Sequence, residues 1–205
     1  MRKELEHFEI GNSYGGNQDW FRTFMMRIGG CGAETACDCS LYFRIHSDLE
    51  NIYPYDLSLL SKHDYISFAH LMEQYLWPRM SGIDSPEIFI AGYSRYLSDR
   101  GVECLSMKPF SGSEPYEKAE KALMRQIDAG FPVPTLILNH KDKEYRDYVW
   151  HWFIINGYNK PEGEGAEDNL YVKAVSYSSY RWLDFRKLWN TGYSQKGGLV
   201  LVDMK

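Results

Sequence analysis

The spacing of apolar and polar residues changes character about halfway along the chain. Residues 1 to about 108 carry helix-type spacing and helix end signals, whereas the later segments are dominated by strand-type apolar runs. Helices followed by strands indicate an α+β protein whose two kinds of structure are segregated. We expect one domain over 1–205, with a helical lobe over about 11–108 and a sheet lobe over about 109–205.

The helical lobe is expected to be built around a helix that begins near Cys31. Its segment, CGAETACDCSLYFRI, has a face of small residues that can pack closely against a neighbour. Ser61 is the expected N-cap of the next helix, which Pro78 would stop, and Ser85 stands before a proline at the start of another. A polar helix over 111–130 closes the series.

The second half predicts a set of four strands. Their apolar, β-rich segments are FPVPTLIL, YVWHWFIINGY, LYVKAVSYS and GGLVLVDM. Between the second and the third, EGEGAED at 162–168 reads as a hairpin-like or irregular loop.

Composition excludes several classes of function. The net charge of −5 argues against a nucleic-acid binder, which needs a basic surface. No apolar run approaches the roughly 18–20 residues of a membrane span, and the N-terminus lacks the apolar region of a signal peptide. We therefore expect a cytoplasmic protein with reduced cysteines and no membrane partner. The aromatic content of 16 % suits either a core or a substrate cleft.

Cys31 is the candidate nucleophile. It stands between Gly30 and Gly32 at the expected helix start, where the helix dipole and free N–H groups favour a thiolate and can receive an oxyanion. We interpret the two glycines as room for a substrate backbone. The alternative is a small buried thiol beside a tight turn, and local sequence does not separate the two.

His151 is the candidate base among the six histidines. It lies near the start of an apolar strand between Trp150 and Trp152, in surroundings that would exclude water and favour a thiolate–imidazolium pair. The alternative is a core histidine bonded to the backbone. A metal site is disfavoured because Cys37 and Cys39 would lie about 200° apart on a helix. We expect no metal and no cofactor.

The order of these motifs resembles the papain-like cysteine peptidases. The stretches that carry the resemblance are GGCGAETA, GFPVPTLIL, HWFIINGY and LYVKAVSYSSYRWLDFRKLW, within residues 11–190. The most similar branch is the bacterial one related to the double-glycine, leader-processing peptidases. The resemblance implies a papain-like fold, with a helical lobe whose central helix opens at Cys31 and an antiparallel sheet lobe.

The resemblance also assigns roles to individual residues. It implies Cys31 as nucleophile, His151 as general base, and Gln18 as the glutamine whose amide helps hold the oxyanion, although papain has a shorter interval between this glutamine and the cysteine. Where the family has an Asn or Asp to orient the imidazole, this chain has Ser176, which brings no charge. Asp184 is the nearest carboxylate, but it is better placed to cap a helix.

Two functions follow from these residues. The first is a cysteine-dependent acyl-transfer enzyme, most simply a peptidase acting on a peptide or protein substrate, with transpeptidation left open because the thioester intermediate is shared. The second is a papain-like scaffold used for binding or assembly with weak or no turnover, which the serine at position 176 favours.

Overall fold

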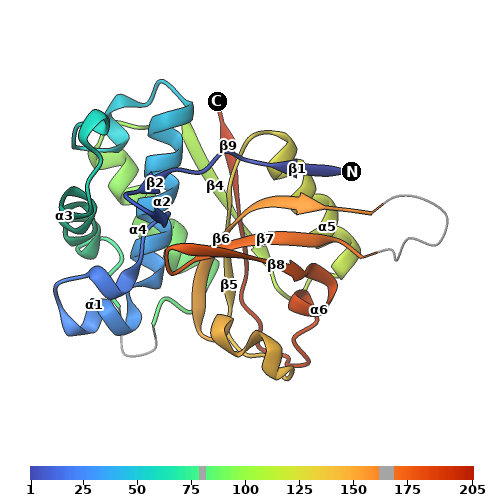
Figure 1. The fold of residues 1–205 in the computed structure, drawn as a ribbon. Coiled ribbons are helices and arrows are strands. Elements are labelled where there is room, and N and C mark those ends of the chain that lie inside the picture. The colour runs from blue at the N-terminus through green and yellow to red at the C-terminus, as the bar shows by residue number, and fades with distance from the viewer. Residues whose placement is uncertain (79–81, 162–168) are drawn as a thin grey trace.

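Helices and strands separate into two neighbouring halves (Figure 1). The computed structural model describes residues 1–78, 82–161 and 169–205. The helices between residues 18 and 99 gather on one side, whereas the sheet lies on the other side together with the helices at 116–128 and 185–189. Helices and an antiparallel sheet together confirm the expected α+β class. The loop expected at 162–168 lies outside the described residues.

The helical half follows the expected end signals. Ser61 and Ser85 cap their helices by accepting the N–H groups of Asp64 and Ile88, and the first of these helices ends before Pro78 is reached. The elements are η1 (Gln18–Trp20), α1 (Phe24–Gly29), α2 (Cys31–His46), α3 (Lys62–Glu73) and α4 (Pro86–Asp99), with short 3-10 turns at Glu50–Ile52 and Leu57–Leu59.

The other half is a seven-stranded sheet in the order β4–β9–β5–β6–β7–β8, with β1 also pairing with β6. Every neighbouring pair runs antiparallel. The strands are β1 (Arg2–Glu4), β4 (Leu105–Ser111), β5 (Val133–Ile137), β6 (His151–Asn159), β7 (Tyr171–Ser176), β8 (Ser179–Asp184) and β9 (Gly198–Met204). A small hairpin, β2 (Glu9–Ile10) and β3 (Ser13–Tyr14), and the helical segments α5 (Tyr116–Asp128), η4 (Lys143–Tyr148) and α6 (Phe185–Trp189) complete the fold.

The four expected strands are present as β5, β6, β7 and β9, but the sheet also contains strands that the pattern did not predict. β4 begins at Leu105, ahead of the expected start of the sheet lobe near residue 109, and β8 also went unpredicted. These two strands lie at the two ends of the strand order, and most of their residues are exposed or half-buried. Edge strands of this kind lack a continuous apolar face, and β4 carries Pro109.

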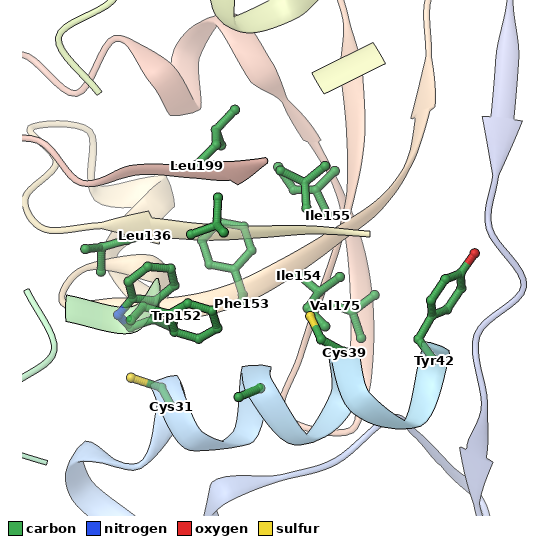
Figure 2. Close-up of a cluster of buried hydrophobic side chains, with 14 of the residues drawn as sticks. Cys31, Cys39, Tyr42, Leu136, Trp152, Phe153, Ile154, Ile155, Val175 and Leu199 are labelled. Atoms are coloured by element: carbon green, nitrogen blue, oxygen red, sulfur yellow. The ribbon is translucent and has the colours of Figure 1, made fainter. Parts of the chain in front are cut away.

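α2 is the buried centre of the molecule. Every residue from Cys31 to Phe43 is buried, and the helix packs against α3 and against β6. Figure 2 shows Cys31 at its first turn beneath Trp152, and Cys39 further along beside Ile154 and Val175. The small residues were expected to form one closely packed face. In the structure they allow close packing around a helix that is enclosed on nearly all sides.

Two carboxyl groups are buried with this helix. Asp38 accepts a hydrogen bond of 2.7 Å from the Tyr65 hydroxyl and bonds of 3.2 Å from the Gly16 N–H. Glu34, one turn earlier, accepts a bond of 3.1 Å from the Gln18 N–H. A buried carboxyl without such donors would be costly, so these bonds fix the loop around residues 16–18 against α2.

Replacing Asp38 by alanine tests this attachment. The change leaves the Tyr65 hydroxyl and the Gly16 N–H buried without their acceptor, so the free energy of unfolding should fall by about 2–4 kcal/mol in urea denaturation. Asp48→Ala removes an exposed carboxylate and should change it by less than about 0.5 kcal/mol. Equal losses in the two variants would show that the buried bonds do not hold the loop.

Candidate active site

Cys31 is the first residue of α2 and follows the end of α1 directly. A Cβ on Gly30 would collide with the Met26 carbonyl oxygen, and one on Gly32 would lie 2.8 Å from the Ile83 side chain. The packing of α1 therefore requires the glycine at position 30, whereas a side chain at position 32 would displace the end of the Ile83 side chain. The interpretation that the two glycines make room for a substrate stays a prediction.

The Cys31 thiol is 8 % exposed, and its environment keeps it protonated. Its pKa is raised to about 11, chiefly by burial and also by the negative charge of Glu34, against the opposing effect of the N–H of Trp152 and of the first N–H groups of α2. The helix terminus thus acts as expected, but burial is the larger effect. The expected resting thiolate is replaced by a neutral thiol.

His151 opens β6, and the neighbouring strand supplies its partner. Nε2 of His151 shares a hydrogen bond of 2.6 Å with Oγ of Ser176, the last residue of β7. The Tyr177 ring lies parallel to the imidazole, with 4.9 Å between ring centroids and 6° between planes. Burial alone lowers the pKa of His151 to about 4, so the ring is neutral at physiological pH.

The strand also links His151 to Cys31. Trp152, the next residue, directs its backbone N–H to the Cys31 sulfur. Within the described ranges, no hydrogen bond joins that sulfur to His151, and Nδ1 of the imidazole has no protein partner there. The structure therefore brings His151 and Ser176 together and holds Cys31 against the same strand, with thiol and imidazole both uncharged.

Backbone strain concentrates around these residues. Among the described residues other than glycine, those with positive φ are Trp150 (53°), Tyr177 (50°) and Ser178 (60°). Trp150 immediately precedes His151, and the other two form the turn that follows Ser176. A two-residue turn of this kind usually takes Asn-Gly, and strain of about 1–3 kcal/mol per residue persists where surrounding structure enforces it.

Gln18 does not take the expected position. Its side-chain nitrogen donates to the carbonyls of Arg27, at 2.9 Å, and Ile28, at 3.5 Å, in the last turn of α1. The helix α1 fills the long interval between Gln18 and Cys31 and captures the amide that was expected to hold an oxyanion. The role expected of Gln18 stays a prediction, and with its amide engaged by α1 the N–H groups at the start of α2 are the other candidate donors to an oxyanion.

Sequence reasoning missed one residue of this site, Glu34. Glu34 accepts N–H bonds from Gln18 and from Tyr177, so it ties α2 to the turn after Ser176. Its pKa is raised well above the usual range by burial and by the charge of Asp38. The sequence signal that could have found Glu34 was a pair of acidic residues four positions apart in a helix of small residues.

Asp184 does cap α6, as expected, by accepting the Lys187 N–H.

A cleft of about 480 Å³ opens at Cys31. Its walls are largely apolar and come from α1, the segment before α4, β5 and β6: Met25, Ile28, Gly29, Cys31, Pro78, Gly82, Ile83, Leu136, Trp150 and Trp152. Several large apolar side chains at its mouth face solvent, with Ile28 63 % exposed and Trp150 50 % exposed. An apolar group bound there would lie beside the thiol.

The buried neutral imidazole predicts how stability depends on pH. An unfolded histidine gains a proton below its ordinary pKa of 6.5, but His151 in the fold does so only near pH 4. The unfolded state therefore binds more protons as pH falls through this window, and the fold loses stability, by up to about 3 kcal/mol. His151→Gln should remove this contribution when urea unfolding is compared from pH 7 to pH 4. Identical pH dependence in both proteins would contradict the neutral, buried state.

Comparison of the chain with protein-family models, with curated proteins and with solved structures finds no match. In the described part of the chain no helix is long and apolar enough to cross a membrane. The resemblance to papain-like peptidases stays a prediction from the order of the motifs along the sequence.

Proposed function

We propose that the protein is a cysteine-dependent acyl-transfer enzyme of papain-like type that cleaves a peptide or amide bond. One observation carries the proposal: the His151–Ser176 hydrogen bond stands at the start of the strand whose next N–H faces the Cys31 sulfur. Residues with left-handed backbone conformation adjoin both His151 and Ser176. They support the proposal, because backbone strain of this kind clusters at functional sites.

The reaction begins from the uncharged pair. As the Cys31 sulfur attacks the substrate carbonyl carbon, Nδ1 of His151 takes the thiol proton, and the carbonyl electrons move onto oxygen. The first N–H groups of α2 receive that oxyanion. Ser176 holds the other ring nitrogen, so the imidazole keeps its orientation while it becomes charged.

The second half of the reaction returns the proton. The tetrahedral adduct collapses to a Cys31 thioester as the amine departs with the proton from His151. His151 then deprotonates a water molecule, which attacks the thioester and releases the acid and the thiol. An amine in place of water would give amide transfer by the same steps.

The apolar cleft suggests what the acyl part contains. Because the acyl group is bonded to Cys31, it occupies the space that the thiol lines. We propose that this part is apolar, since Met25, Ile28 and the two tryptophans line that space. The large exposed apolar area at the mouth would then be covered by substrate.

A second function is favoured by specific observations. The resting thiol and imidazole are both neutral, Ser176 brings no charge, and the Gln18 amide is engaged elsewhere. A binding scaffold that has kept the papain-like arrangement without turnover would show the same features. The two functions differ in whether Cys31 accepts an acyl group.

Acylation by p-nitrophenyl butyrate tests the proposal. Wild type should form a butyryl adduct on Cys31, located by peptide mass spectrometry, and His151→Gln should slow its formation by about 10²–10⁴-fold because proton transfer is lost. Cys104→Ser is the control that should leave the rate unchanged. Acylation of Cys31 no faster than that of Cys104, and unaffected at position 151, would favour the scaffold.

The length of the acyl chain provides a separate prediction. Each added methylene from acetate to hexanoate should raise the acylation rate about threefold while the chain is being buried in the cleft. Ile28→Gln, an exposed position, should weaken this dependence without affecting the acetate ester. An acylation rate that does not depend on chain length would show that the cleft does not bind the acyl part.

A further inference from the structure

A second pocket adjoins the site on the side of Ser176. It measures about 400 Å³ and lies between η4 and the hairpin formed by β7 and β8, whose turn reaches toward the helices in Figure 1. Ser176 and Tyr177, which contact the imidazole, form part of its wall together with Tyr148, Tyr180, Arg181 and Asp147. It shares no described lining residue with the cleft at Cys31.

The chemistry of acyl transfer gives this pocket a place in the reaction, and this step rests on the proposed function. The acyl part of the substrate stays on Cys31, whereas the leaving part must receive its proton from His151. The leaving part therefore lies on the side of the imidazole. The pocket whose wall includes Ser176 and Tyr177 adjoins the imidazole at Nε2 and along one ring face, so a leaving part that receives its proton from Nδ1 enters this pocket where it extends past the ring.

The pocket wall carries a cation with free donors. The Arg181 side chain is 51 % exposed, and its closest carboxylate oxygen, on Asp147, lies 3.7 Å away, beyond hydrogen-bond distance. Such an exposed ion pair contributes little free energy. A ligand carboxylate that binds the planar guanidinium with both oxygens can therefore displace the Asp147 carboxylate. Lys173, on the same hairpin, does not line the pocket and forms a 2.8 Å ion pair with Glu4, which leaves Arg181 as the cation of the pocket wall.

We propose that this pocket binds a carboxylate on the leaving part of the substrate, with Arg181 as its cationic partner. The Tyr177 and Tyr180 hydroxyls, which have no protein partner within the described residues, line the same space. The carboxylate belongs either to the free C-terminus of a peptide or to an Asp or Glu side chain. The same guanidinium serves both, so the experiment has to separate them.

Binding of short peptides to the full-length Cys31→Ala protein tests the proposal without turnover. The probes are acetyl-Gly-Gly-Ala as free acid and as amide, and acetyl-Gly-Gly-Glu-amide with acetyl-Gly-Gly-Gln-amide. Kd is measured from amide shifts of residues 176–181 by NMR. At least one acid should bind about tenfold more tightly than its neutral counterpart, a difference typical of a charge-assisted hydrogen bond.

Variants at the pocket decide which group is responsible. Arg181→Gln should bring the preference for the acid below about twofold, and Asp147→Asn should increase it by removing a competing carboxylate. Arg125→Gln removes the same charge from an exposed position on α5 and should change nothing. A preference confined to the free acid identifies the C-terminus, and one confined to the glutamate probe identifies a side chain.

Three results would overturn the proposal: equal binding of acid and neutral probes, a preference that survives Arg181→Gln, or no shift with any probe at its solubility limit. Each of these results is independent of Cys31 acylation, because binding is measured with the Cys31→Ala protein, which lacks the thiol. A failure of the pocket is thereby distinguishable from a failure of the acyl-transfer reaction.

Discussion

The burial of α2 with two carboxyl groups on it is the constraint on which the site depends. A carboxyl group removed from water needs hydrogen-bond donors. Glu34 and Asp38 accept hydrogen bonds from segments far apart in the chain. The loop near Gly16 also exchanges backbone bonds with the turn after Ser176, through Ser178. The hydrogen bonds to these two carboxyl groups therefore bring together Cys31, the N-terminal loop and the strand end that holds the His151 imidazole.

The same burial sets the ionisation of the site. Enclosure disfavours charge on either Cys31 or His151, so the acidic partner has a raised pKa and the basic partner a lowered one. Proton transfer between them at rest would create two charges in surroundings that already disfavour one. In the proposed reaction, proton transfer coupled to attack on a substrate differs, because the negative charge would pass on to an oxygen that the helix N-terminus can receive. The enclosure is thus compatible with the proposed reaction without a standing ion pair.

Local signals predicted the parts of the structure that depend on local chemistry. The caps at Ser61 and Ser85 and the four apolar strands follow from residue types within a few positions of each other. The juxtaposition of His151 with Ser176 followed from motif order. The edge strand β4, the packing role of Gly30 and the capture of Gln18 by α1 depend on tertiary neighbours, which spacing alone does not specify.

A serine at position 176 is consistent with the charge already buried nearby. The charge of Asp38 raises the pKa of Glu34, and the Glu34 charge in turn raises the pKa of Cys31 and of Tyr177. A carboxylate in place of Ser176 would add another negative charge to this enclosure and would oppose the thiolate that forms during attack. The hydroxyl orients the imidazole through a bond of 2.6 Å without that repulsion. In the proposed reaction, a serine at this position therefore fits a site in which charge would appear only during attack on the substrate.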